Sequence, residues 1–572
     1  MSIGHWRRAA LFGLIALAPL TARAEAPPSD PDPSKSDIVV TARPEPQKRG
    51  GWKQAEADHV IVLSDGSEGE LVRITENLER LHALMTRLYG SAGAAQGAPK
   101  LRVTLLGDDA ALQRLKPRFE EGPFTEAFAG QRYYHPRADG TMLAVLRRDQ
   151  IIDLDTAIAR NRFCDELAAD DKFCMGKTDP NAVPIGRSWE AVLYSAFAQH
   201  FILANVPAPY PRWYLDGVGA LFSTIKVRKN GALDYAQPPE NYKAVFRSFG
   251  DINARAVLTG TYLDAPSRTM RWTPYHAWLI THYFVFSDAR PAVRAQFDHY
   301  MAAIGRGVPQ AEAAEAFGDL GRLNREIAGY ATRRIYFARA DTPEAIPAPP
   351  VVTLLSPADE AVIEARLRLG DLPPVLANTA GTTPAPWIDG LRSTLTSLPF
   401  DADATLVAVE AECRSAETGM CLADASRVLE QAPQNARATA WRGVAQASRA
   451  LTGPASERAA ALAEARQTIA RAIELDPDDA VAATAYFQSF VKAGEPAPEA
   501  AMAGLARIAA RAPAAPEPRL MMAEELVREG KTDLAQRLLR PVLYGAYDTP
   551  EKTAARALFP TSLPPATPQA GQ

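Results

Sequence analysis

The sequence predicts an α+β fold with a small mixed sheet and a helical layer, followed by an all-α domain of repeated helices. Residues 51–150 combine strand-length apolar runs with one long run of helical spacing, which is typical of an α+β domain. From residue 401 the apolar spacing is helical throughout. Similar segments there end at Pro433, Pro477 and Pro513, which stand 44 and 36 residues apart (477 − 433 and 513 − 477), and this indicates a repeat.

The first part opens on elements that hydrophobic periodicity defines. His59–Leu63 is an apolar run of strand length, and Leu101–Leu106 and Met142–Leu146 are two more. Between the first two runs, Gly69–Tyr89 places leucine and isoleucine on one helical face. We therefore expect a strand, a long helix and two further strands.

The centre of the first part is a pair of helices separated by a proline-rich turn. Residues 189–204 carry large apolar side chains at spacings of three and four, which predicts a helix with one wide apolar face. Residues 206–209 (Val-Pro-Ala-Pro) end it, because proline cannot continue the hydrogen-bond ladder. A second short helix is expected to begin near Trp213 and to carry Asp216 and Phe222.

This pair of helices resembles the core of the gluzincin metallopeptidases, in particular the peptidase-MA-like domains of bacterial envelope proteins. In that family one helix carries His-Glu-x-x-His-His-Phe and the next carries Trp-Leu-x-Glu-Gly-x-Ala-x-x-Phe. Residues 197–201 (Phe-Ala-Gln-His-Phe) align with the end of the first motif. Trp213, Gly217 and Phe222 match the second motif in register. The resemblance covers residues 51–336, about half of the chain.

The motif positions that hold zinc in the family carry other residues in this chain. Zinc needs two histidines one helical turn apart and a third ligand, with a glutamate as general base. The alignment places Ser195 at the first histidine, Ala196 at the base, Gln199 at the second histidine and Asp216 at the ligand glutamate. Because serine and glutamine are poor zinc ligands and alanine cannot accept a proton, the resemblance implies a pseudoenzyme without catalytic residues or cofactor.

A third helix is expected over residues 275–286, which are apolar on nearly all sides and should be buried. An aromatic-rich helix at this place also belongs to the resemblance. Candidate residues bordering the degenerate cleft are His200, Trp213, Tyr275 and His276.

An alternative interpretation retains a metal. Asp216, His200 and a histidine of residues 275–286 would then form a rearranged zinc site, and the protein would be an active metallopeptidase. His276 and His282 lie six residues apart and do not share a helical face, so each is better explained as a core or hydrogen-bonded histidine. Zinc is a cofactor only under this alternative.

Residues 1–24 have the pattern of a secretory signal peptide. Arg7 and Arg8 form a charged start, residues 9–20 an apolar core, and Ala22-Arg-Ala24 a cleavage motif. No later segment reaches the ~18 apolar residues of a spanning helix, so the mature chain is expected to lack a transmembrane segment. We therefore expect the periplasm or cell envelope of a Gram-negative bacterium.

The four cysteines fit an oxidising compartment. Cys164 and Cys174 are close in sequence, and so are Cys413 and Cys421. Of the three connectivities that four cysteines allow, two local disulfides are the simplest. A cysteine-based metal site is the alternative, but the chain lacks the C-x-x-C spacing.

Residues 25–50 are rich in proline, serine and charge, and are expected to form a disordered leader. Residues 36–43 resemble the TonB box of outer-membrane transporters, which adds a strand to the edge of the TonB periplasmic domain. That docking strand would consist of Asp37, Ile38, Val39, Val40 and Thr41. The alternative is a chance Val-Val-Thr run in a linker.

The second half is expected to hold a short, irregular helical array. Residues 337–400 are rich in proline and alanine and are interpreted as a connector. Residues 401–560 resemble tetratricopeptide repeats, with residues 452–458 as an insertion that explains the longer spacing. A plain helical bundle is the alternative, and residues 561–572 are expected to be a disordered tail.

Composition and architecture together favour a scaffold. Lys+Arg and Asp+Glu nearly cancel, giving a net charge of −4, so no nucleic-acid partner is expected. Stacked helix pairs commonly bind peptide segments on a concave face. The favoured hypothesis is an envelope pseudo-metallopeptidase that binds a protein or peptide through this face and the degenerate cleft. The alternatives are the rearranged zinc peptidase and an accessory factor of a TonB-dependent system.

Overall fold

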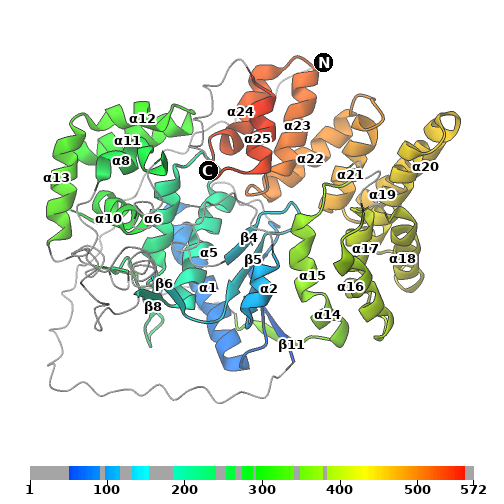
Figure 1. The fold of residues 1–572 in the computed structure, drawn as a ribbon, viewed down its shortest axis with the longest axis horizontal. Helices are drawn as coiled ribbons and strands as arrows, with labels where there is room; N and C mark the ends of the chain where they lie inside the picture. Colours follow the sequence, from blue (N-terminus) through cyan, green and yellow to red (C-terminus); the bar gives the residue numbers. More distant parts are fainter. Residues whose placement is uncertain are drawn as a thin grey trace, which may run out of the picture.

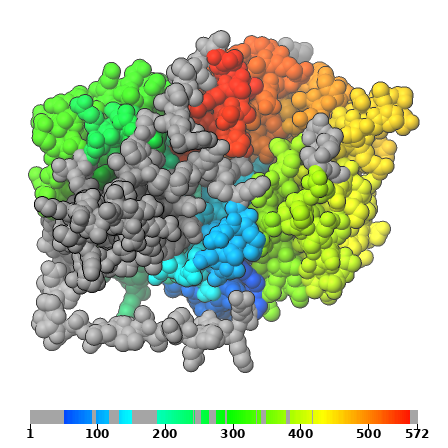
Figure 2. Space-filling view, viewed as in Figure 1, coloured from blue at the N-terminus to red at the C-terminus, as the bar shows by residue number. Residues whose placement is uncertain are grey.

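A computed structural model describes residues 51–560, except residues 91–96, 116–131, 154–184, 240–241, 243–252, 265–272, 288–290, 334, 336, 341–347, 378–382 and 416. An α+β half and a helical half lie side by side (Figure 1). In Figure 2 the blue and cyan strand region lies between the green helical layer and the yellow-green helices. The predicted signal peptide, leader, TonB-box-like segment, Cys164–Cys174 pair and tail fall outside the described residues.

The main sheet has six strands in the order β11-β1-β2-β3-β5-β4. Its parallel pairs are β2 with β3 and β3 with β5, and its other neighbours are antiparallel, so the sheet is mixed. The strands are β1 (Lys53–Glu56), β2 (Val60–Ser64), β3 (Leu101–Leu106), β4 (Arg132–His135), β5 (Met142–Leu146) and β11 (Val351–Leu354). The three strands predicted from sequence are confirmed as β2, β3 and β5.

Helices cover both faces of this sheet. The predicted long helix is α1 (Glu68–Tyr89), capped by Ser67, whose side chain accepts from the Glu70 amide. Its buried residues Leu71, Ile74, Leu78, Leu81 and Leu84 lie in one core with β2, β3, β5 and the helical layer. On the opposite face, Leu112 of α2 (Asp109–Gln113) and Leu367 of α15 (Ile363–Arg368) pack on alternate residues of β4 and β5.

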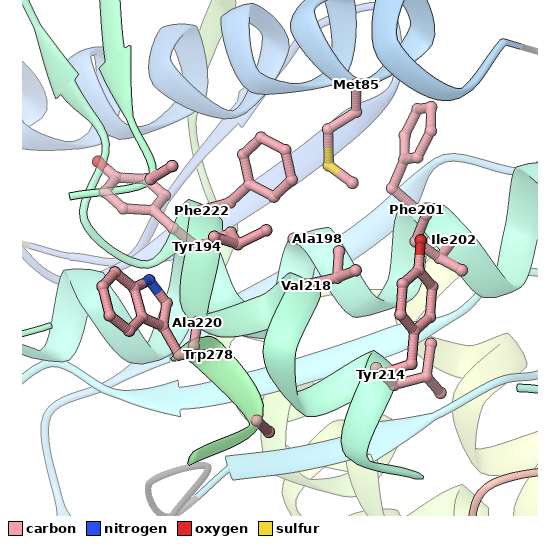
Figure 3. Packing of buried hydrophobic residues seen from close by; sticks show 14 of the residues in the cluster. Met85, Tyr194, Ala198, Phe201, Ile202, Tyr214, Val218, Ala220, Phe222 and Trp278 are labelled. Carbon is pink, nitrogen blue, oxygen red and sulfur yellow. The ribbon is translucent and has the colours of Figure 1, made fainter. Parts of the chain in front are cut away.

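The helical layer of the α+β half is built around α5 (Trp189–Asn205), α6 (Arg212–Phe222) and α10 (Thr273–Phe286), in agreement with the three helices expected there. Figure 3 shows Phe201, Ile202, Val218 and Phe222 converging beneath Met85 of α1. The other helices of this half are α8 (Ala254–Thr259), η2 (Thr261–Asp264), α11 (Pro291–Gly305), α12 (Gln310–Ala313), η3 (Ala314–Phe317) and α13 (Leu320–Ala331). A second sheet consists of β8 (Lys226–Val227), β9 (Leu233–Tyr235) and β10 (Ala338–Ala340). A third sheet is the pair β6 (Gln150–Asp153) and β7 (Ile185–Arg187).

The helical half consists of antiparallel helices joined by short turns, which fits the predicted repeat-like region. It begins with α14 (Pro357–Ala361), α15, η4 (Leu369–Asp371) and α16 (Pro386–Thr396). It continues with α17 (Ala402–Cys413), α18 (Thr418–Gln431), α19 (Ala436–Thr452), α20 (Ala455–Leu475), α21 (Ala480–Val491), α22 (Glu499–Arg511), α23 (Glu517–Arg528), α24 (Thr532–Leu543) and α25 (Pro550–Ala557). Pro433, Pro477 and Pro513 each follow the second helix of a pair. We call α17–α25 the array.

The longer proline spacing has a different origin from the one expected. α19 ends at Thr452 and α20 already begins at Ala455, so most of the expected insertion is helical. α19 and α20 have 17 and 21 residues, against 12 and 13 in α21 and α22. The additional residues therefore lengthen the helices instead of forming a loop.

The expected connector is divided between the two halves. β10 pairs with β9, and β11 pairs with β1, so residues up to 354 complete the sheets of the α+β half. α14 to α16 share a core with α17, so residues from 357 belong to the helical half. Proline in this region marks the starts of α14 and α16, where its missing N–H costs nothing.

A disulfide joins Cys413 at the end of α17 to Cys421 in α18, as predicted. The described residues contain no free cysteine. None of the described helices is both long and apolar enough to cross a bilayer.

Candidate functional site

The candidate cleft depends on how closely α6 approaches its neighbours. A Cβ added at Gly217 would stand 2.7 Å from the Ala277 carbonyl oxygen of α10. A Cβ at Gly219 would stand 2.6 Å from Ser195 Oγ and 3.0 Å from Gln199 Nε2. Both positions bring a Cβ closer than real Cβ contacts allow, so glycine at these two positions lets α6 pack between α5 and α10.

The motif positions from α5 and α6 converge. Gln199 Nε2 donates to Asp216 Oδ1 at 3.4 Å and to the Leu215 carbonyl oxygen at 3.2 Å. Gln199 Oε1 accepts from Arg132 Nη2 of β4 at 2.5 Å. The residue at the expected second-histidine position therefore forms hydrogen bonds with the residue at the expected ligand-glutamate position.

Arginines flank this cluster. Asp216 is buried, and Arg212, one helical turn earlier, places Nε 3.6 Å from Asp216 Oδ2. Arg132 Nη1 is buried without a hydrogen-bond partner among the described residues. Both terminal atoms of the Gln199 amide are occupied, so this side chain holds β4, α5 and α6 together.

The donor set does not fit zinc. Its atoms are a serine hydroxyl, a glutamine amide bound to Arg132 and one carboxylate next to Arg212. Across the described part of the chain, no three His, Cys, Asp or Glu side chains lie together in a way that could hold a metal ion. Ala196, at the general-base position, has no group that could accept a proton.

His200 belongs to a separate cluster on the side of α1 and β4. Its Nδ1 lies 3.1 Å from the Tyr134 hydroxyl. His82 stacks on His59 with ring centroids 3.6 Å apart, and His59 Nδ1 lies 2.7 Å from Glu79 Oε2. Burial, assisted by the neighbouring imidazoles, lowers the pKa of His200 to about 3 and that of His82 to about 4, so both are neutral at pH 7.

The other candidate cleft residues are buried. Trp213 is fully buried and donates from Nε1 to the Tyr300 hydroxyl at 3.0 Å. Tyr275 and His276 are buried on α10, and burial lowers the pKa of His276 to about 4. His282 Nδ1 lies 2.8 Å from the Tyr330 hydroxyl. These contacts fit a packed core.

A second polar cluster, which the sequence analysis missed, joins the two halves. We call it the junction cluster: Arg137, Asp139, Glu410, Arg414, Arg437 and Asp479. The turn between β4 and β5 reaches the array, where Arg137 Nη2 lies 2.6 Å from Glu410 Oε1. Arg437 Nη1 lies 3.2 Å from Asp139 Oδ2. In the array, Arg437 Nε lies 2.6 Å from Asp479 Oδ2, and Arg414 Nη1 lies 2.7 Å from Glu410 Oε1.

The junction cluster is electrically balanced, with three cations and three anions. Burial alone would raise the pKa of Asp139, but Arg137 and Arg437 more than offset this and hold it well below its usual range. Burial likewise opposes ionisation of Glu410, whose pKa is nevertheless lowered by Arg137 and Arg414. These two carboxylates are therefore ionised at neutral pH.

The far end of the array also touches the α+β half. Gly307 has a positive φ of +88°, and its Cα faces the ring of Tyr544 so closely that a Cβ would clash. The Arg212 guanidinium lies 5.5 Å from the centre of the Tyr547 ring, within cation–π range. Ala546 and Tyr547 pack against the core of the α+β half. The loop after α24 therefore lies beside the N-terminus of α6.

The fold defines an α+β domain docked on an array of antiparallel helix pairs. No family model and no curated protein matches the chain. A solved structure of a thermophilic TPR protein from Thermus thermophilus is similar at 17% identity and a TM-score of 0.27, covering 30% of this chain and 88% of that chain.

One sequence signal could have revealed the junction. Residues 406–413 read Leu-Val-Ala-Val-Glu-Ala-Glu-Cys, so Glu410 and Glu412 stand inside an apolar run. Charged residues are rarely buried without a partner, so such a glutamate predicts a buried arginine. The sequence does not say that the partner of Glu410 is Arg137, 273 residues earlier.

Proposed function

We propose that this protein is a non-catalytic, protein-binding scaffold of the bacterial envelope, in which a gluzincin-like helical layer has lost its metal. The observation that supports this most directly is the Gln199 bridge between Arg132 and Asp216. Gln199 and Asp216, which align with two zinc-ligand positions of the resembling family, are hydrogen-bonded to each other. The envelope location rests on the signal-like sequence of residues 1–24.

Metal analysis of the purified full chain tests the loss of catalysis. We expect much less than one zinc per chain and no chelator-sensitive hydrolysis of peptides. Stoichiometric zinc together with such hydrolysis would overturn the proposal and favour the rearranged site of Asp216, His200 and a histidine of α10.

A matched gain-of-function variant tests the ancestry separately. The quadruple variant Ser195→His, Ala196→Glu, Gln199→His and Asp216→Glu would restore the family pattern on α5 and α6. We expect it to bind zinc, because side chains four residues apart on one helix can share a metal. A control with Ala196→Glu alone should bind none. A folded quadruple variant without zinc would contradict the gluzincin resemblance.

A role with TonB is a second candidate, carried only by the sequence of residues 36–43. Deleting this segment should abolish binding to the TonB periplasmic domain, since strand addition needs the extended run itself. Replacing Val39 and Val40 with proline is the matched point variant, because proline removes the donors of the added strand. Unchanged binding in both variants would remove this candidate.

A further inference from the structure

The junction cluster indicates what the array recognises on the face that meets the β4–β5 turn. This face, which we call the inner face, carries Glu410, Arg414, Arg437 and Asp479. We propose that this face is a receptor for a turn with the pattern Arg-small-Asp, that Arg137-Ala138-Asp139 fills it within the same chain, and that a partner protein bearing the same pattern can replace this turn. The inference rests on the proposed scaffold function and names its binding surface.

The receptor charges are positioned by the array itself. Glu410 accepts from Arg414 Nη1 at 2.7 Å, and Arg414 also donates to the carbonyl oxygens of Leu372 and Pro373, both at 2.8 Å. Arg437 Nε donates to Asp479 at 2.6 Å. Asp479 in turn caps α21 by accepting from the Ala482 amide at 2.8 Å. These contacts do not involve the turn, so the acidic and basic groups are preorganised.

The turn supplies the complementary pair. Arg137 binds Asp139 through Nε at 2.9 Å and Nη2 at 3.0 Å, so the two side chains form one planar unit. This unit presents its cation to Glu410 and its anion to Arg437. A ligand with the charges in the opposite order would face like charges at both positions.

The residue between the two charges must be small. Ala138 packs against a cluster of Ala480, Ala483 and Ile508 from α21 and α22. A large side chain would displace the neighbouring charges from their partners. Gly140, with φ +138°, follows directly and gives the turn a conformation that other residues rarely adopt.

The turn leaves part of the inner face open. A pocket beside it is lined by Val375, Trp441, Val481, Thr484 and Glu517 in addition to the junction charges. Arg137 Nη1 is buried without a hydrogen-bond partner among the described residues. A partner segment that replaces the turn brings its own arginine, and a longer segment could also fill this pocket and accept the corresponding N–H. The occupant we infer is therefore a protein segment with an aliphatic or aromatic residue flanking the Arg-small-Asp turn.

A peptide displacement experiment on the full chain tests this proposal. The probe is a fluorescent, cyclised peptide with the sequence of residues 132–142, and the control probe carries alanine at the positions of Arg137 and Asp139. The double variant Arg137→Ala and Asp139→Ala should bind the probe at least ten-fold more tightly than the unaltered chain, because no turn competes within the molecule. Adding Glu410→Ala to that variant should remove this binding.

Two results would overturn the proposal. One is equal affinity of the probe for the unaltered chain and the double variant, and the other is equal affinity of the probe and the control probe. If the double variant does not fold, hydrogen exchange of the unaltered chain decides. An excess of the probe should speed exchange at the amides of residues 137–140 at least three-fold, and no change would refute displacement. The metal analysis described above tests only the site on α5 and α6. Zinc binding there would overturn the proposed loss of catalysis without changing the outcome of the peptide displacement experiment.

Discussion

The two polar clusters of this protein differ in what their charges hold. In the candidate cleft, the carboxylate of Asp216 is shared between an amide and Arg212 within adjacent helices. In the junction cluster, three carboxylates and three guanidinium groups connect residues up to 342 positions apart (479 − 137). The cleft cluster fastens local helices, and the junction cluster fastens the two halves.

This difference bears on the scaffold function proposed above. An active site needs groups whose protonation or coordination can change during a reaction. The cleft offers an amide, a hydroxyl and one aspartate. Three guanidinium groups and three carboxylates are paired where the halves meet, so the junction cluster helps to fix the orientation of the halves.

The largest expected effect comes from breaking the junction. Arg437→Ala should lower the free energy of unfolding by about 3–5 kcal/mol, because it leaves Asp139 and Asp479 buried without their shared cation. Urea denaturation followed by circular dichroism measures this. Arg471→Ala is the control, since its pair with Glu474 is exposed and should contribute below about 1 kcal/mol. Equal losses in both variants would show that the junction is a surface contact.

Acid should destabilise the histidine cluster of the α+β half at a higher pH than the junction cluster. The pKa values of His82 and His200 are lowered by burial, so the unfolded state binds more protons and stability falls as pH drops from 6.5 toward 4. For His82 alone, lowering the pKa to about 4 corresponds to a loss of about 3 kcal/mol in the free energy of unfolding at low pH. The pKa values of Glu410 and Asp139 are also lowered, but from 4.5 and 3.8, so the junction weakens only below these values.

Midpoints of urea unfolding at pH 7.5, 5.5 and 3.5 measure the two losses of stability, the first from the histidines and the second from the junction carboxylates. His82→Asn should remove part of the stability loss between pH 6.5 and 4, to which His200 and His276 also contribute, and should leave the loss below pH 4 unchanged. A single acid transition that this variant does not alter would contradict the assignment of the first loss to the histidines.

The disulfide offers a smaller test confined to the array. Removing the link with Cys413→Ser and Cys421→Ser should cost about 2–3 kcal/mol, the loop-closure value for eight residues. Hydrogen exchange should rise in α17 and α18, next to Glu410, and stay constant in α5 and α6. Faster exchange throughout the chain would mean that the disulfide also stabilises the candidate cleft.

The smallest effect is expected in the cleft. Gly219→Ala adds a methyl group 2.6 Å from Ser195 Oγ. Overpacking costs about 1–3 kcal/mol, and the helix propensity of alanine offsets up to about 1 kcal/mol of this. A net loss of about 1–2 kcal/mol in thermal unfolding is therefore expected. Ser195→Ala should rescue much of it, and failure of this rescue would argue against the described proximity of α5 and α6.

The regular elements could be predicted from sequence where apolar periodicity was strong. β3, β5, α5 and α10 appear within two residues of their expected bounds. β1 and β4 were missed because Lys53-Gln-Ala-Glu56 and Arg132-Tyr-Tyr-His135 contain polar residues that find partners only in the folded protein. The contact of Gln199 with Asp216 could be expected from motif spacing.

Long-range partners could not be predicted in the same way. His200 was grouped with the cleft because of its position in the motif, and its contact with Tyr134 depends on where β4 lies. The connector looked irregular because of its prolines, although Val351-Val-Thr-Leu354 is a β-branched run that suits a strand. The partners of Glu410 and Arg437 depend on where the β4–β5 turn meets the array, and local sequence does not encode this.

The pairing of β1 with β11 affects the order in which parts of the chain can fold. Lys53 faces Leu354, so the first strand waits for a partner that is 301 residues further along (354 − 53). Until that partner is available, β1 exposes an open strand edge, which is a known starting point for aggregation. A contact of such long range is also slow to form. A chaperone that shields residues 53–56 during biosynthesis would therefore raise the yield of native protein, and moving the segment 348–355 to the N-terminal side of β1 would reduce that need.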